Sequence, residues 1–339
     1  MAVLTRDEFR QLGTWTALLA ILAIVGLVQF LHFAPTDHDQ DIYFSFVEGQ
    51  RILAGENPYA RVLDGDFRTN EKYATYFPLF YELSALTQAA GLRTYDEWIL
   101  FWRVVFGVFD LGITLLLFET CRRRGALLLG VFAAGLWGLG RWSLFVVRIA
   151  HLDFLPIFFL LLSLLWLRDR PRAAFLLYGV SLAFKQIGIF LAPLYLVWAW
   201  QYADHDLKSL VRAACWIALV PLVASLPFLL WNAPGFVGSV LFSAMRDARS
   251  HFGALSVDAL FALEGAAARL PMLSLLAAVY GLAATRTTGV YTSCLLVFAV
   301  FVDLNSVLYT HYPAWLVPFV GTAPLDALEN KAGAPPDPR

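Results

Sequence analysis

The sequence predicts an all-α protein that crosses a membrane many times. Of its 339 residues, 59% are hydrophobic and only 15% are charged. The apolar residues gather in runs that approach the ~20 residues a membrane helix needs. A soluble domain of this length could bury a core, but it would not contain a succession of uncharged runs of that size. The formal net charge of −1 gives no indication of a nucleic-acid partner.

Each apolar run is predicted to be helical, because a span in lipid must satisfy its own backbone hydrogen bonds. The first run follows Arg6 and Arg10, and we interpret it as a retained anchor, since it has membrane length and no small-residue cleavage site follows it. The runs 173–186 and 187–203 are short, and they form either two spans or one broken passage. The ten predicted spans are 12–33, 97–119, 126–147, 153–167, 173–186, 187–203, 212–231, 270–285, 287–304 and 311–325.

Basic residues mark the connections on one side of this predicted bundle. They occur at 122–124, at 168–172, at Lys208 and Arg212, and at Arg286. Because short basic loops stay in the cytoplasm, we expect these connections and both termini to be cytoplasmic. The expected location is a plasma (inner) membrane, with the other connections extracytoplasmic.

We predict one transmembrane domain, residues 1–325, followed by a disordered cytoplasmic tail, 326–339. Two long segments, 34–96 and 232–269, lie on the extracytoplasmic side. The first contains the run "YFPLFYELSALTQAAGL", which is too short and too aromatic for a span. We therefore expect it to form an amphipathic helix in the outer interface, where Tyr and Phe are favoured.

Ionisable side chains within apolar runs are candidates for function, because they are costly at membrane depth. Arg103 and Asp110 are seven residues apart and share a helix face, so we favour a structural role in which they neutralise each other or a neighbour. For Arg141 we also favour a structural role, either reaching to the interface or pairing with Asp153. Lys185 lies roughly 20 Å along its predicted span, and a structural and a functional role are both open.

Three further groups have two or more interpretations. Arg246 and Arg249 could bind an anion bidentately or contact lipid headgroups. His311, taken alone, is more typical of a boundary histidine. The aspartates of "TDHDQD", Asp39 and Asp41 among them, could begin a solvated acidic loop, bind a divalent cation, or supply a general base.

Several motifs in one order resemble the GT-C glycosyltransferases, which are multi-span enzymes that use polyprenyl- or dolichyl-phosphate sugars. The resemblance covers most of residues 30–320, in patches. The motifs are Asp41 with Gly55 and Asn57-Pro58-Tyr59, "TYFPLF" at 75–80, Phe184-Lys185-Gln186 with Ala192-Pro193, and "THYPAWLVPF" at 310–319.

The resemblance implies a GT-C-like bundle of about ten helices whose long first extracytoplasmic loop carries interfacial helices. It implies an inverting transfer of a hexose, with mannose or glucose favoured, from a polyprenyl-phosphate donor to a lipid or glycan acceptor. Membrane lipids are the other expected partners, and no nucleic acid is. No metal or other cofactor is expected to be obligatory, although the aspartates permit a divalent cation.

The resemblance also assigns roles to residues. The general base would be Asp41, with Asp39 orienting it or the acceptor. The donor phosphate would lie against Arg246, Lys185, His311 and Arg249. The substrate cleft would be lined by Tyr43, His151, Asp153, Tyr59 and Gln186. Two alternatives stay open: a transporter or lipid-linked sugar flippase, and a non-catalytic membrane assembly subunit.

Overall fold

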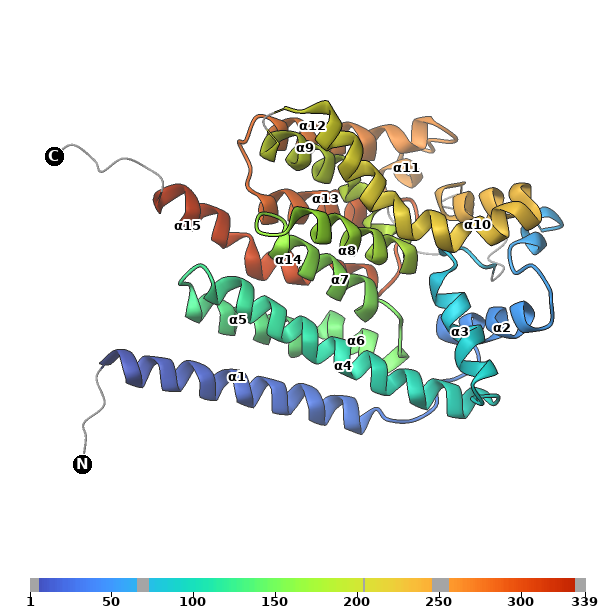
Figure 1. Ribbon diagram of the computed structural model, residues 1–339, viewed down its shortest axis with the longest axis horizontal. Coiled ribbons are helices and arrows are strands. Elements are labelled where there is room, and N and C mark those ends of the chain that lie inside the picture. The colour runs from blue at the N-terminus through green and yellow to red at the C-terminus, as the bar shows by residue number, and fades with distance from the viewer. Residues whose placement is uncertain (1–5, 66–72, 204, 246–255, 333–339) are drawn as a thin grey trace.

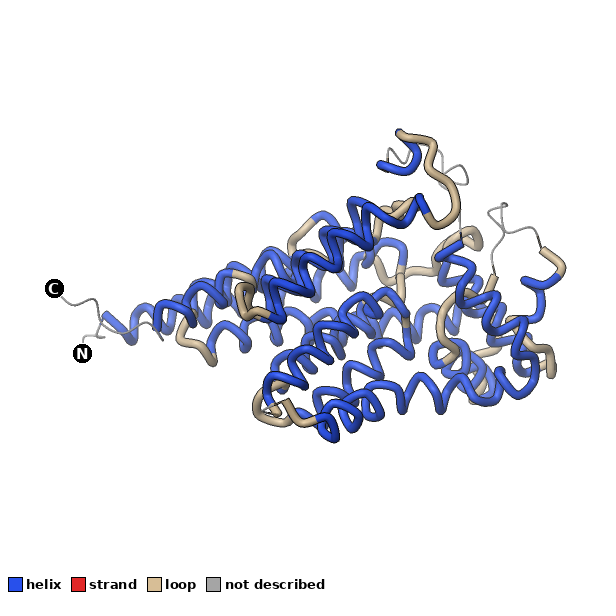
Figure 2. The backbone as a smooth tube through the Cα atoms, turned by 90° about the horizontal axis from the view of Figure 1, so that it is seen from above, coloured by secondary structure: helices blue, strands red, loops and turns tan. Residues whose placement is uncertain are grey.

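The computed structural model of the protein describes residues 6–65, 73–203, 205–245 and 256–332, and these residues form helices and no strand (Figures 1 and 2). The α-helices are α1 (Arg6–Leu31), α2 (Asp41–Leu53), α3 (Leu79–Ala89), α4 (Tyr95–Arg122), α5 (Leu127–Gly138), α6 (Arg141–Ile149), α7 (Phe154–Trp166), α8 (Pro171–Phe184), α9 (Ala192–Tyr202), α10 (Leu207–Met245), α11 (Val257–Leu260), α12 (Leu270–Ala284), α13 (Val290–Leu304), α14 (Val317–Thr322) and α15 (Pro324–Ala332). Short 3₁₀ helices are η1 (Ala60–Leu63), η2 (Gln186–Leu191), η4 (Ala267–Arg269) and η5 (Tyr312–Trp315).

Among the described residues, 4 helical segments are long and apolar enough to cross a membrane: Gln11–Leu31, Tyr95–Arg122, Leu207–Phe242 and Ala267–Ala284. Helices α5 and α6 together make a fifth if their bend of 42° lies within one span. Helices α7, α8 and α13 are apolar but shorter. The predicted all-α class is therefore confirmed, together with several helices of membrane length. By length and composition alone, the helices do not reach the ten predicted spans.

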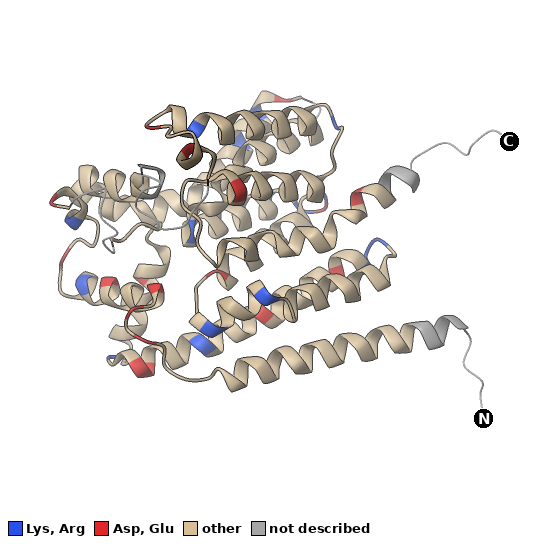
Figure 3. Ribbon diagram, turned by 180° about the vertical axis from the view of Figure 1, so that it is seen from behind, with Lys and Arg blue, Asp and Glu red and all other residues tan. Residues whose placement is uncertain are grey.

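The connections that carry the basic residues meet at one end of the bundle, which we call the basic end. There the Arg124 Nη1 donates to the Tyr291 hydroxyl at 2.9 Å, which joins the end of α4 to the start of α13. The Gln201 amide donates to the Ala283 carbonyl at 3.0 Å, which joins the ends of α9 and α12. Helix α1 begins at this end and α15 reaches toward it (Figure 1), while the helix bodies carry few charges (Figure 3).

The opposite end of the bundle, which we call the site end, carries α2 and α3 (Figure 1). Helix α3 packs on α2 and on α4, where Phe80 contacts Trp102 at a centroid distance of 4.8 Å. Gly49 lets α2 and α3 approach closely: a Cβ at this position would lie 2.9 Å from the Ala85 backbone nitrogen. Because α3 is only 11 residues long, it packs on these helices without running the length of the bundle.

The chain reverses direction at Lys185, at the site end. The Lys185 backbone is extended, with φ −157 and ψ 125, so α8 ends there and η2 turns back. Farther along, Tyr178 of α8 stacks on Tyr195 of α9 with centroids 3.8 Å apart. The segments 173–186 and 187–203 are therefore two antiparallel neighbours, not one broken passage.

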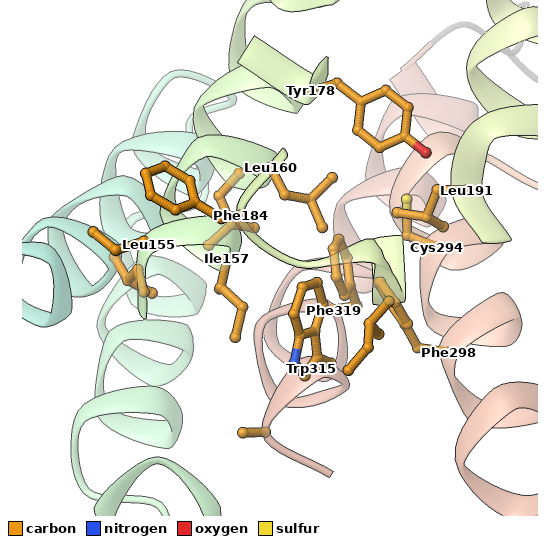
Figure 4. Packing of buried hydrophobic residues seen from close by; sticks show 14 of the residues in the cluster. Leu155, Ile157, Leu160, Tyr178, Phe184, Leu191, Cys294, Phe298, Trp315 and Phe319 are labelled. Atoms are coloured by element: carbon orange, nitrogen blue, oxygen red, sulfur yellow. The ribbon is translucent and has the colours of Figure 1, made fainter. Parts of the chain in front are cut away.

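Large side chains of α7, α8, α13 and the η5–α14 segment fill the centre of the bundle (Figure 4). Phe298 lies 5.5 Å from Trp315 and 5.5 Å from Phe319, measured between ring centroids. Close packing of this kind holds apolar helices together, because an apolar face alone gives no preference for protein over lipid. This packing fixes the starts of α7 and η5, which Asp153 and His311 immediately precede.

Helix α10 has a kink where the second long segment was predicted to begin. Asn232 departs from helical geometry, with φ −156 and ψ 84, and its Oδ1 accepts a hydrogen bond from the Gly235 amide at 3.0 Å. The side chain therefore caps a new helical start after the kink. Beyond it, Ser239 donates to the Ala74 carbonyl at 2.5 Å, so the two predicted extracytoplasmic segments pack on each other.

The predicted tail differs from the structure. Residues 326–332 belong to α15, and Asp326 accepts a hydrogen bond from the Thr292 amide at 2.7 Å. This contact anchors α15 to the start of α13, so disorder from residue 326 is wrong for this part of the tail. Residues 333–339 lie outside the described residues.

Candidate functional site

A buried ion pair lies at the site end. The Lys185 ammonium is 2.6 Å from the Asp153 Oδ1, and the two side chains are 1% and 0% exposed. Lys185 stands at the tip of the α8–α9 hairpin, and Asp153 immediately precedes α7. The ammonium also lies 5.1 Å from the centre of the Tyr76 ring. A buried pair of this kind costs desolvation energy, so it is weak support for stability and calls for another explanation.

Two histidines extend this pair toward Asp41. The His151 Nδ1 is 3.2 Å from the Asp153 Oδ2, and its Nε2 is 3.9 Å from the Asp41 Oδ2. The ring of His311 stacks on His151 with centroids 4.3 Å apart. We call Asp153, Lys185, His151 and His311 the buried cluster, and Asp41 lies at its edge with 28% of its side chain exposed.

The charges within the buried cluster follow from its contacts. The Lys185 ammonium contacts one oxygen of Asp153, and the His151 ring lies beside the other. The buried carboxylate is therefore paired with a cation. His311 can donate a hydrogen bond from a ring nitrogen.

A polar cavity of about 60 Å³ adjoins the cluster, with room for a few water molecules. Three parts of the chain line it: one face of α2, the segment that leads into α3, and the segment around η5. Asp41, Ser45 and Glu48 of α2 share a face because they are spaced by three, four and seven residues. The lining residues are Asp41, Phe44, Ser45, Glu48, Tyr73, Thr75, Tyr76, Tyr81, Tyr309, His311 and Tyr312.

Glu48 is a second carboxyl on this cavity that was not predicted. Its side chain is 2% exposed and lies 3.5 Å from the Arg51 Nε and 3.4 Å from the Arg61 Nη1. Burial raises its pKa to about 7, against the opposing effect of the two arginines. A signal was present in the sequence, since Glu48 follows Asp41 by two helical turns, but the sequence analysis considered only the cluster of aspartates.

The structure brings together five of the predicted site residues, which come from distant parts of the chain: Asp41, His151, Asp153, Lys185 and His311. Two more predicted residues, Tyr59 and Gln186, form hydrogen bonds to the backbone of residues that line the cavity. The Tyr59 hydroxyl donates to the Tyr76 carbonyl at 2.8 Å, and the Gln186 amide donates to the Thr75 carbonyl. Both side chains therefore hold the lining residues 75–76 in place.

The other predicted site residues lie elsewhere. Asp39 is exposed and accepts a hydrogen bond from the Gln40 side chain at 2.9 Å. Tyr43 points to another face of α2, where its ring stacks on His38 at 4.5 Å, because successive helix positions are about 100° apart. Neither belongs to the cavity lining. Arg246 and Arg249 lie outside the described residues.

The charges within α4 have structural partners. The Arg103 guanidinium donates to the carbonyls of Ala34 at 2.5 Å and Val147 at 3.0 Å. Asp110 accepts hydrogen bonds from the Gln29 and Trp137 side chains, each at 2.8 Å. The predicted structural role fits both residues, but each is paired with other groups and not with its neighbour seven residues away.

Arg141 does not pair with Asp153. Its side chain is exposed and lies 5.7 Å from the Trp142 ring centre, while Asp153 is occupied by Lys185 and His151. The alternative pairing suggested by the sequence is therefore wrong, because the hairpin tip places a lysine next to Asp153 instead.

His151, Asp153 and His311 are the described residues that could hold a metal ion, since their ligand atoms all lie within 4.8 Å of one another. Imidazole and carboxylate are typical zinc ligands. However, the Lys185 ammonium occupies one oxygen of Asp153, and the two imidazole rings are stacked at an interplanar angle of 23°. Ligand rings direct their nitrogens at a shared ion, so this arrangement suits a buried ion pair better than a metal centre.

Comparison of the chain with protein-family models, with curated proteins and with solved structures gives no match in any of the three. A function for this chain is therefore inferred from the buried cluster, from the cavity beside it, and from the order of the sequence motifs that converge there.

Proposed function

We propose that the protein is an integral-membrane, inverting glycosyltransferase. It would move a hexose, with mannose or glucose favoured, from a polyprenyl-phosphate donor to an acceptor hydroxyl on the extracytoplasmic side. One observation carries the proposal: Asp41 lines a polar cavity, 3.9 Å from His151 and beside the buried Lys185–Asp153 pair. Buried, incompletely satisfied polar groups that converge on a cavity are typical of a reactive site.

The position of the cavity supports an extracytoplasmic site. The basic connections lie at the opposite end of the bundle, and short basic connections favour the cytoplasm. The proposed orientation therefore places both termini in the cytoplasm and α2 and α3 at the outer surface. In this topology α7, α8, α9, α13 and the η5–α14 segment join the four long segments and the α5–α6 pair in a bundle of about ten spans.

Asp41 is the proposed general base. An acceptor hydroxyl in the cavity would give its proton to the Asp41 carboxylate as its oxygen attacks the anomeric carbon. The bond from that carbon to the phosphate oxygen breaks at the same time, so the configuration inverts and polyprenyl phosphate leaves. The partial burial of Asp41 favours this role, because desolvation makes a carboxylate more basic.

The leaving phosphate needs positive charge or hydrogen-bond donors in a site with little water. The Lys185 ammonium is shared with Asp153, so it supplies only part of that charge. His311 lines the cavity and would donate a hydrogen bond. The remaining charge is assigned to Arg246 and Arg249. A hexose is larger than the cavity, so donor binding must displace some of the lining side chains.

A transporter or lipid-linked sugar flippase is the second candidate, and one feature favours it. Among the described residues, helix α10 is interrupted near the site end, at Asn232. Discontinuous helices beside a buried charge are typical of secondary transporters. A flippase would move the lipid-linked sugar without breaking the bond to phosphate, so product analysis separates the two functions.

The test is sugar transfer by the purified protein in detergent. Polyprenyl-phosphate mannose, glucose and galactose are supplied in turn, with a membrane lipid extract as acceptor. We compare the wild type with Asp41→Asn and, as a matched control, with Asp39→Asn, an exposed carboxyl only two positions away. We expect transfer from one donor, its loss in Asp41→Asn with donor binding retained, and little change in Asp39→Asn.

Other results would overturn this assignment. Equal transfer by the wild type and by Asp41→Asn would remove Asp41 from the base role. Donor binding with movement across a vesicle membrane but no transfer would support the flippase. A protein that binds none of the three donors would favour a non-catalytic assembly subunit.

A further inference from the structure

A groove at the basic end is separate from the candidate site. It lies where the starts of α8 and α10 meet the end of α9. A cavity of about 150 Å³ has Arg172, Arg212 and Trp216 in its lining, together with apolar side chains such as Phe175. A more open hollow of about 520 Å³ continues from it and shares these two arginines and the tryptophan. Its outer wall is formed by Cys215 and Leu219 of α10.

The groove presents positive charge. Arg172 is exposed and makes no hydrogen bond or ion pair with another described residue. It also lies in the first turn of α8, a helix of 14 residues, whose N-terminus carries a partial positive charge. Asp206, which lies within electrostatic range of Arg212, accepts hydrogen bonds from the Ser209 backbone amide at 2.9 Å and from the Ser209 hydroxyl at 2.7 Å. Both arginines therefore have donors available to an anion.

An apolar stripe leads away from the arginines along α10. Its members are spaced by three or four residues, so they lie on one helix face. They are also strongly exposed, at 43%, 59%, 53% and 79% for Leu219, Leu222, Leu226 and Leu230. The helix that carries them is one of the segments long and apolar enough to cross a membrane. Arg212 and Cys215 continue the same spacing toward the basic end.

Other arginines at the basic end lack this arrangement. The Nε atoms of Arg122 and Arg123 lie 2.5 Å and 2.8 Å from the Glu119 carboxylate. That carboxylate is shared by both guanidinium groups and offsets one of their two positive charges. The basic end thus contains an arginine pair bound to a carboxylate of the chain and an arginine pair that faces a groove with an apolar extension.

We propose that this groove binds an anionic phospholipid of the membrane. The phosphate would lie between the guanidinium groups of Arg172 and Arg212, which match phosphate geometry. One acyl chain would follow the exposed leucines of α10. Basic pockets between membrane helices recognise anionic headgroups in this way. The proposal does not depend on the catalytic role of Asp41, because the groove and the cavity lie at opposite ends of the bundle.

The experiment measures the thermal stability of the purified protein in neutral detergent during titration with phosphatidylglycerol. Phosphatidylcholine is the neutral-lipid arm, and inorganic phosphate is the arm for a free anion. The variants are Arg172→Gln/Arg212→Gln and, as a control with the same charge change at the same end, Arg122→Gln/Arg123→Gln. Native mass spectrometry of the same samples counts retained lipids.

We expect a saturable rise in Tm with phosphatidylglycerol only. Loss of the groove arginines should weaken the apparent affinity at least about tenfold, since each removes a charge-assisted hydrogen bond. The control variant should keep the wild-type response. Equal weakening in both variants would mean a diffuse charge effect, and an undiminished response in the groove variant would place the lipid elsewhere. A response to inorganic phosphate equal to that to lipid would show an anion site without lipid recognition. Each of these three results overturns the proposal.

Discussion

The charges of α4 and those of the buried cluster differ in how completely their polar atoms are satisfied. In α4, Arg103 donates to backbone carbonyls and Asp110 receives two side-chain donors from α1 and α5. In the buried cluster, neither ring nitrogen of His151 and only one oxygen of Asp153 has a hydrogen bond of ordinary geometry within the described residues.

This difference separates a structural role from a functional one. The charges of α4 join elements that must stay together, and neither Arg103 nor Asp110 lines the cavity beside the cluster. The cluster has unused hydrogen-bonding capacity beside a cavity, which costs stability unless a substrate or water uses it. Burial of a charge is thus not enough to indicate function. The number of its hydrogen bonds that remain unmade is more informative.

The largest effect is expected from Lys185→Met. This change leaves the Asp153 carboxylate buried without its counter-ion, which should cost about 3–5 kcal/mol of unfolding free energy. Unfolding in detergent, followed by tryptophan fluorescence, measures it. In the double variant Asp153→Leu/Lys185→Met, both charges are absent, and most of the lost stability should return while sugar transfer stays abolished. If Lys185→Met alone were as stable as the wild type, the Lys185–Asp153 ion pair would not be buried away from water.

The variant Glu48→Gln tests whether the Glu48 carboxyl is buried at the cavity, through the pH dependence of stability. Because the folded-state pKa of Glu48 is raised to about 7 from 4.5, the folded protein holds this proton more tightly than the unfolded chain does. The stabilising effect of the proton is complete below pH 4.5 and is lost as the pH rises to about 7. The shift corresponds to about 3 kcal/mol.

The wild type should therefore lose stability relative to Glu48→Gln between these two pH values, and the two unfolding curves should be compared at pH 5 and pH 8. Asp206→Asn is a matched control, since that carboxyl lies at the basic end. A constant difference between the wild type and Glu48→Gln at both pH values would show that Glu48 is not buried.

A smaller effect is expected in α4. Asp110→Asn replaces an acceptor of two hydrogen bonds by an amide that can accept from only one of Gln29 and Trp137, so it should cost about 1–3 kcal/mol. Stability is measured as for Lys185→Met, and transfer is measured per folded molecule. Stability should fall and transfer should not. Loss of transfer in a variant that remains folded would give α4 a functional role.

The smallest effect is expected at Asp39, which was predicted as a catalytic partner of Asp41. Its carboxyl is exposed and, within the described part of the chain, accepts a hydrogen bond only from its neighbour Gln40. Asp39→Asn should therefore change stability by less than about 0.5 kcal/mol. Thermal unfolding measures the change. A larger loss of stability would show that the Asp39 carboxyl makes more contacts with the rest of the chain than the structure indicates.

Sequence analysis predicts the helical class and five residues of the site. Lys185 is found because a charge in an apolar run is costly, and the roles of the other four come from the resemblance of the motifs. Helix periodicity could have refined this list: Asp41 and Glu48 share a face of α2, whereas Tyr43 does not. Other features needed the tertiary structure. The pairing of Asp153 with Lys185, 32 positions away, depends on the reversal of the chain at the hairpin tip, and no local pattern specifies that contact.

Transfer of sugar by Asp41→Asn and Asp110→Asn decides between the roles assigned to the two groups of buried charges. The two variants make the same carboxylate-to-amide change, one beside the cavity and one within α4. We predict that Asp41→Asn loses about 10²–10⁴-fold in transfer rate while it still binds donor, as removal of a general base requires. Asp110→Asn should keep nearly the wild-type rate per folded molecule. Equal rates in the two variants would contradict the assignment of catalysis to the site end.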